Sequence, residues 1–146
     1  MENIIQAKKL TKVYGEKETS VTALDNIDVQ FNENEFTAIM GPSGSGKSTL
    51  LHCLAGLDRP TSGQILLKDQ DISTLNDKQL TKIRRDSFGF VFQAFNLIPT
   101  LTAEENITLP ASIAGRKPDM DWIKQVVETV DILSLIHISE PTRPRL

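Results

Sequence analysis

The sequence predicts an α/β fold in which an N-terminal antiparallel β region precedes a parallel core. Two short, nearly continuous apolar runs, at residues 36–40 and 88–92, have the pattern of strands that are buried on both faces of a parallel sheet. A glycine-rich loop follows the first run directly, and a helical apolar pattern follows the loop. A strand, a loop and a helix in this order are typical of an α/β core.

The first thirty residues predict two half-buried strands. Residues 4–13 are apolar at irregular intervals, and Ile27, Val29 and Phe31 alternate with polar residues. Residues 32–34, Asn-Glu-Asn, supply a turn before the first buried run.

Helix and turn signals organise the middle of the chain. Beyond Lys47, four leucines fall on one helical face, and Gly56 is the expected end of this helix. The leucines of this face are Leu50, Leu51, Leu54 and Leu57. We expect an edge strand at 65–67, a turn at 69–71 and a short helix that starts near Asn76.

The last third of the chain predicts an irregular loop and two helices. The loop is expected at 93–100, after the second buried run. Thr102 and Glu105 have the spacing of a capping box, in which the two side chains satisfy each other's backbone amides at a helix start. The apolar stripe of a final amphipathic helix consists of Met120, Ile123, Val127 and Val130.

Length and composition exclude several classes of protein. A chain of 146 residues allows one domain, and its 39% apolar and 24% charged residues are near globular averages. The net charge is −3, and the acidic and basic residues are scattered along the sequence, so no basic cluster indicates nucleic-acid binding. Cys53, His52 and His137 indicate neither a disulfide nor a zinc site. No apolar run approaches the roughly 18 residues of a membrane span, and no signal-peptide pattern is present, so we expect a cytosolic chain.

Residues 41–48, Gly-Pro-Ser-Gly-Ser-Gly-Lys-Ser, match the phosphate-binding pattern G-x-x-x-x-G-K-[ST]. The glycines let backbone amides curl around an anion, and the following helix adds the positive end of its dipole. Lys47 can neutralise terminal phosphates, and Ser48 can ligate magnesium. A flexible glycine turn with an exposed lysine is the alternative, which the strand and helix flanks disfavour. The residues expected to bind nucleotide in this loop are Gly41, Ser43, Gly44, Ser45, Gly46, Lys47, Ser48 and Thr49.

Further stretches give the chain a resemblance to the ATP-binding cassette family, the nucleotide-binding domains that power membrane transporters. They are residues 12–15, 56–63, 88–93 and 95–102. The resemblance spans about residues 4–132. The sequence around Gln93 is most similar to the subgroup of macrolide exporters, lipoprotein-releasing systems and peptide-antibiotic resistance transporters. It implies a P-loop NTPase fold, with an N-terminal antiparallel β region and an incomplete RecA-like parallel core.

The resemblance also assigns roles outside the phosphate loop. Tyr14 matches the aromatic residue that stacks on adenine, and its rigid ring suits that contact; ordinary packing at a strand end is the alternative. Gln93 matches the glutamine that contacts magnesium or the attacking water, and a solvent-exposed loop residue is the alternative. ATP and Mg²⁺ are thus the implied cofactors, with Ser48 and Gln93 as metal contacts and with Lys47 and Gln93 as catalytic residues.

Hydrolysis in the family needs features that this sequence lacks. A signature loop of the Leu-Ser-Gly-Gly-Gln type, an apolar strand ending in Asp-Glu and a later switch histidine do not occur. His137 is not that histidine, because the signature loop and the acidic strand should precede it. We therefore expect the printed chain to bind MgATP without hydrolysing it, and its full-length parent to be an ATPase that drives transport.

The resemblance implies protein partners and a location. In the full-length parent, a second nucleotide-binding domain would join head to tail, and membrane-spanning permease subunits would contact the loop after Gln93. The subunit is therefore expected to be cytoplasmic and peripheral on the inner face of the cell membrane. No nucleic-acid partner is expected.

Residues 133–146 resemble nothing in the family. From Leu133 to Arg143 they look like the translation of a transposase-type sequencing adapter. We therefore expect residues 1–132 to be part of a nucleotide-binding domain and residues 133–146 to be a non-native tail.

Two other functions are compatible with a nucleotide-binding loop. One is a non-catalytic nucleotide-binding remnant that never had the missing features. The other is a DNA-repair or chromosome-type ATPase of the same fold. The sequence disfavours the DNA-acting class, because it has neither the long heptad-patterned helices nor the basic stripe of such proteins.

Overall fold

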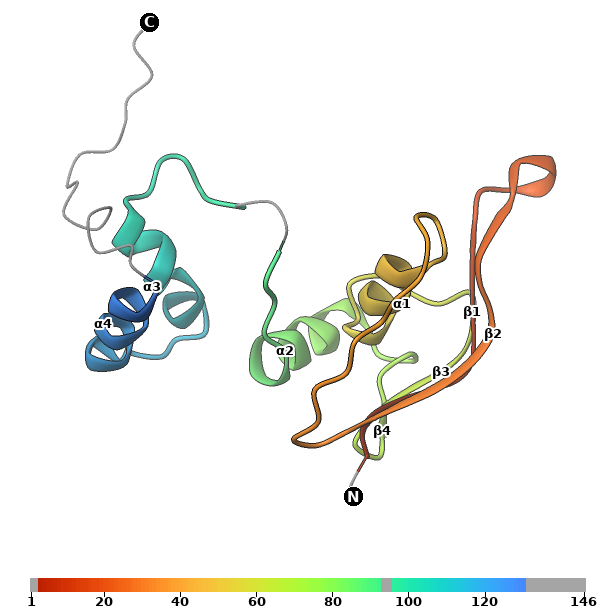
Figure 1. The fold of residues 1–146 in the computed structure, drawn as a ribbon, viewed down its shortest axis with the longest axis horizontal. Helices are drawn as coiled ribbons and strands as arrows, with labels where there is room; N and C mark the ends of the chain where they lie inside the picture. The colour runs from red at the N-terminus through yellow and green to blue at the C-terminus, as the bar shows by residue number, and fades with distance from the viewer. Residues whose placement is uncertain (1–2, 93–95, 131–146) are drawn as a thin grey trace, which may run out of the picture. The chain divides into compact units, whose positions relative to one another are not determined.

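A computed structural model describes residues 3–92 and 96–130, which fall into two compact units on either side of the bond between Phe88 and Gly89 (Figure 1). The first unit contains β1 (Asn3–Tyr14), a short 3-10 helix (Lys17–Thr19), β2 (Val21–Asn32), α1 (Lys47–Leu54), β3 (Ser62–Leu67), β4 (Gln70–Asp71) and α2 (Asp77–Ser87). The second contains α3 (Ala103–Ile113) and α4 (Met120–Thr129).

The strands of the first unit form one four-stranded sheet in the order β2-β1-β3-β4. Each neighbouring pair is antiparallel, so the predicted N-terminal antiparallel β region is confirmed. β1 lies inside the sheet and pairs with β2 on one edge and β3 on the other, which joins the chain's first residues to residues 62–67. The strand expected at 65–67 is the second half of β3, but it is an inner strand between β1 and β4 and not the predicted edge strand. The turn expected at 69–71 lies at 68–69, because residues 70–71 form β4.

A bulge in β1 corrects the side-chain alternation of this strand. Ala7 and Leu10 are both fully buried although they are three residues apart, a spacing that would place them on opposite faces of an unbroken strand. The register shifts between them, and Lys9 adopts a positive φ of 48°. Gly63 of β3 fits against this bulge because a Cβ there would lie 2.4 Å from the Lys9 carbonyl oxygen.

The core of the first unit lies between the sheet and the two helices α1 and α2 (Figure 1). Its members are apolar side chains of β1, β2, β3, α1 and α2, together with Ile72 just after β4. The buried residues of this cluster are Ala7, Leu10, Leu24, Cys53, Leu54, Ile65, Ile72 and Leu80. Burial raises the pKa of the Cys53 thiol, as expected for a small core residue rather than a nucleophile.

The prediction of two strands at 36–40 and 88–92 is wrong. Neither run is in a strand, and Phe36 is 97% exposed and Val91 103% exposed. An apolar run becomes an inner strand only when neighbouring strands supply partners for its amides and carbonyls. β1 to β4 pair with one another in an antiparallel sheet, and neither run pairs with either edge of it.

The predicted helices are confirmed, but α1 ends at Leu54 with Ala55 as its C-cap, so both Leu57 and the expected end at Gly56 lie outside this helix. Asn76 and Thr102 each form a capping box, at the start of α2 and α3 respectively. Asp119 caps α4, whose Val127 is buried. The leucine face of α1 is only partly buried: Leu54 lies in the core, while Leu51 is 51% exposed.

Candidate functional site

The glycine-rich loop leads directly into α1 and lies against the start of β2. Loop and strand together line a pocket of about 290 Å³. Its lining residues are Val21, Thr22, Ala23, Ser43, Gly44, Ser45, Gly46, Lys47, Ser48 and Thr49. The structure therefore brings together the loop residues that the sequence singles out, except for Gly41, which is not part of this lining.

Gly46 fixes the loop against β2. It is the residue immediately before α1 and has a φ of 85°, a left-handed conformation that favours glycine. A Cβ at this position would lie 2.4 Å from the carbonyl oxygen of Ala23, closer than van der Waals contact allows. The two backbones can approach this closely only because residue 46 lacks a side chain.

We expect a Gly46→Ala change to destabilise the first unit more than Gly44→Ala. Gly44 also has a positive φ, of 80°, but no atom lies within 4 Å of its added Cβ. Gly44→Ala should therefore cost only the backbone strain, about 1 kcal/mol, and Gly46→Ala should cost at least about 1 kcal/mol more because the loop must move away from β2. Urea denaturation of both variants measures the difference, and equal midpoints would contradict the close approach.

The N-terminus of α1 differs from the other helix starts in having no side-chain cap and no acidic residue in its first turn. Side chains of Asn76, Thr102 and Asp119 cap α2, α3 and α4. The first amides of a helix have no partner inside the helix, so the first turn of α1 presents unpaired donors and the positive end of a dipole to the pocket. This arrangement suits an anion.

Lys47 places its ammonium group over the loop. Its Nζ donates to the carbonyl oxygens of Gly41 at 2.8 Å and Pro42 at 2.7 Å, and to Ser45 Oγ at 3.3 Å. These contacts hold a full positive charge beside the uncapped helix start. Ser48 also lines the pocket, and its exposed hydroxyl is a ligand type that magnesium accepts. Amides, an ammonium and a hydroxyl are together the donor set that a magnesium-bound polyphosphate requires.

Tyr14 lies at the end of β1, directly opposite Val21, a residue of the pocket lining. Side chains of directly opposite residues share one face of a sheet, so the Tyr14 ring lies next to the pocket. Its hydroxyl donates to Asp58 Oδ2 at 2.6 Å, and the ring remains 41% exposed. The hydrogen bond to the Asp58 carboxylate raises the pKa of Tyr14.

Lys12 and Asp58, for which the sequence predicts no role, complete this corner. Lys12 Nζ forms an ion pair with Asp58 Oδ1 at 2.6 Å and lies 4.7 Å from the centre of the Tyr14 ring. Burial raises the pKa of the Asp58 carboxyl, but the hydrogen bonds from Lys12 and Tyr14 outweigh it and leave that pKa below its ordinary value. Both residues lie in stretches that carry the family resemblance, but because they are 46 residues apart, no periodicity or local motif could have revealed that they pair.

Gln93, the remaining predicted site residue, lies outside the described residues, as does the predicted tail at 133–146. No cluster of three His, Cys, Asp or Glu side chains that could hold a metal ion occurs within 3–92 and 96–130. In the same part of the chain, no helix combines the length and the apolar character needed to cross a membrane.

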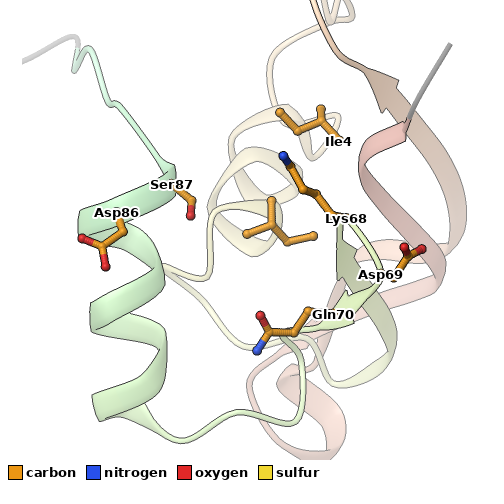
Figure 2. Close-up of a pocket in the computed structure, with 7 residues that line it drawn as sticks. Ile4, Lys68, Asp69, Gln70, Asp86 and Ser87 are labelled. Carbon is orange, nitrogen blue, oxygen red and sulfur yellow. The ribbon is translucent and has the colours of Figure 1, made fainter.

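A second pocket in the first unit, of about 470 Å³, shares no lining residue with the loop pocket (Figure 2). It lies between the turn from β3 to β4 and the end of α2. Lys68 in this lining is paired with Glu33 at 3.3 Å, and Asp86 with Arg85 at 2.9 Å. These two charges are therefore already paired within the protein, and no predicted site residue lines this pocket.

The chain is similar in sequence to ABC transporter proteins. The model of the family described as "ABC transporter" matches residues 24–142. A macrolide export ATP-binding/permease protein, MacB of Marinobacter nauticus, is 48% identical over 115 residues, which cover 79% of this chain and 18% of that protein. MJ0796 of Methanocaldococcus jannaschii, an uncharacterized ABC transporter ATP-binding protein, is 51% identical over 107 residues, which cover 73% of this chain and 46% of that protein.

Solved structures agree with these relatives. The dimeric structure of MJ0796, described as a bacterial ABC transporter cassette, superposes with a TM-score of 0.79 at 42% identity and covers 90% of this chain and 60% of that one. A dimeric post-hydrolysis state of the same cassette, bound to ADP and Pi, gives a TM-score of 0.78 at 42% identity, with 96% and 61% covered. The chain thus spans less than two thirds of the length of each of these proteins.

Proposed function

Since the chain belongs to the ABC transporter family, we propose that it is part of an ATP-binding subunit that binds MgATP at the loop pocket. The observation that carries this proposal is the uncapped start of α1 with the Lys47 ammonium beside it. An uncapped helix start, a lysine and a glycine loop form an anion site with few other uses. The ADP and Pi bound to the similar cassette MJ0796 support the same ligand class.

Each residue of the pocket has a distinct part in this proposal. The amides of the loop and of the first turn of α1, including Thr49, would surround the phosphates, and Lys47 would exchange its contacts with loop carbonyls for phosphate oxygens. Ser48 would be a magnesium ligand, with Gln93 as a second contact; the ion would supply positive charge to the terminal phosphates. Tyr14 would stack on the base beside the pocket.

We assign ATP hydrolysis to a full-length protein that contains this chain rather than to the 146-residue chain alone. Lys47 and Gln93 are the catalytic residues that this chain would contribute. The sequence contains no signature loop, no Asp-Glu strand end and no switch histidine. The non-catalytic remnant therefore remains a second candidate, and it predicts that the gene encodes none of these features beyond residue 132.

The partners and location follow from the family. A second nucleotide-binding domain is proposed as a partner, in keeping with the dimeric MJ0796 cassettes. The MacB relative is named an ATP-binding/permease protein, and this name supports membrane-spanning partner subunits. Such a subunit would lie in the cytoplasm, peripheral to the inner face of the membrane.

We assign residues 1–132 to the nucleotide-binding domain and residues 133–146 to a non-native tail. The family match reaches residue 142, past this boundary, so the assignment needs a direct test. Long-read sequencing of the source gene through the Ile132 codon provides it. The assignment predicts a frame that continues into a signature loop and an Asp-Glu strand; the same tail followed by a stop codon would overturn it.

Binding of MgATP to the whole 146-residue chain tests the central proposal. We expect saturable binding at one site in isothermal titration calorimetry. Inorganic triphosphate should compete, because it can occupy the loop, and AMP should compete poorly, because it lacks the terminal phosphates. Competition by AMP as strong as that by triphosphate would place the ligand elsewhere.

A further inference from the structure

We propose that Asp58, held in place by Lys12, is a positioning residue that fixes the Tyr14 ring for contact with a nucleobase beside the loop pocket. This inference rests on the proposed nucleotide function and deepens it, because it names what makes the site selective for a nucleotide over a bare polyphosphate. The residues come from two segments, the end of β1 and the turn after α1, that meet only in the folded protein.

The first support is the geometry of the three side chains. Tyr14 donates to one carboxylate oxygen of Asp58 at 2.6 Å, and Lys12 donates to the other oxygen at 2.6 Å. Lys12 donates as well to the Arg59 carbonyl oxygen at 2.7 Å, so the lysine is tied to the backbone on which Asp58 lies. The carboxylate is thus fixed on both oxygens, and it fixes the phenol in turn.

The second support is the way in which Lys12 covers the ring. Its Nζ lies 4.7 Å from the ring centre of Tyr14, within the range of a cation–π contact. The Lys12 side chain is only 12% exposed, whereas Tyr14 is 41% exposed. One face of the ring is therefore occupied by a largely buried ammonium, and a flat base would stack on the other face.

The third support is the need for such a restraint. A tyrosine at a strand end with this much exposed surface would otherwise exchange between rotamers, and a ligand would have to immobilise it on binding. Side-chain immobilisation on this scale corresponds to roughly 3- to 10-fold in affinity. The pKa of Tyr14 is raised by the same Asp58 carboxylate, which gives the contact a spectroscopic signature.

The test compares Asp58→Asn with Asp77→Asn in the full chain, using MgATP and inorganic triphosphate as ligands. Asp77 is a matched control, because its carboxylate also pairs with a basic side chain, Arg59 at 2.7 Å, but lies 91% exposed on α2. We expect Asp58→Asn to weaken MgATP binding roughly 3- to 10-fold and to leave triphosphate binding unchanged. Asp77→Asn should change neither. Tyr14→Ala should weaken MgATP at least as much as Asp58→Asn, because it removes the stacking surface itself.

A second readout separates positioning from simple structural support. Tyr14 is the one tyrosine in the chain, so the ultraviolet titration of tyrosinate reports on it alone. Asp58→Asn should bring the pKa of Tyr14 down towards its ordinary value, and Asp77→Asn should not. The proposal is overturned if Asp58→Asn leaves MgATP affinity unchanged, or if triphosphate affinity falls in parallel with it. Failure of the unmutated chain to bind triphosphate would instead overturn the proposed function itself.

Discussion

A Lys47→Ala change is expected to lower the affinity for MgATP about 100-fold. The change removes the full positive charge that lies beside the start of α1 and its donors to the loop, while the backbone amides remain. Hydrogen bonds to charged groups contribute about 1.5–3 kcal/mol each, and about 2.7 kcal/mol corresponds to this factor. Calorimetric titration with MgATP and with triphosphate measures the loss, which should be similar for both ligands.

Lys78→Ala is the matched control for this prediction. Lys78 is an exposed lysine on α2 and does not line the loop pocket. Its removal changes the net charge by the same amount, so any loss that it causes reports general electrostatics alone. Equal losses for the two variants would contradict a specific role of Lys47.

Leu10→Ala is expected to destabilise the first unit by about 3 kcal/mol. Leu10 is fully buried in the cluster between the sheet and the two helices. Truncation of a buried leucine typically costs about 2–5 kcal/mol, because apolar contacts are lost and a cavity remains. Urea denaturation followed by circular dichroism measures the free energy of unfolding.

Leu51→Ala provides the comparison for the core, since Leu51 lies on α1 but is 51% exposed. The same atoms are removed there from a position that is half in water, so we expect a loss below about 1 kcal/mol. A similar loss for both leucines would mean that Leu10 is not in a packed core.

Elements with a complete local signal could be predicted from the sequence. The capping residues Asn76 and Thr102 mark the starts of α2 and α3 because cap and partner are three residues apart. The local sequence of the runs at 36–40 and 88–92 contained only part of the information that defines a strand. Their apolar character was visible, but a strand also needs a neighbour, which local sequence does not specify. The bulge at Lys9 was missed for the same reason, because it depends on Gly63 of β3.

In the candidate site, too, residues that are contiguous in sequence could be predicted and contacts between distant segments could not. The loop around Lys47 is contiguous in sequence, so motif and spacing predicted its residues together. Tyr14 could be named only by resemblance. The ion pair between Lys12 and Asp58 joins residues 46 positions apart and became visible only once β1 and the turn after α1 were placed side by side. Contacts between distant segments are set by the fold and not by local pattern.

The most direct test of nucleotide binding at the loop pocket is the backbone amide spectrum of the full, nitrogen-15-labelled chain during titration with MgATP. We predict saturable shifts of the Gly44, Gly46 and Ser48 amides, which line the loop pocket. The amides of residues 68–70, which line the second pocket, should stay in place. Unchanged loop amides, or saturable shifts confined to residues 68–70, would contradict the account.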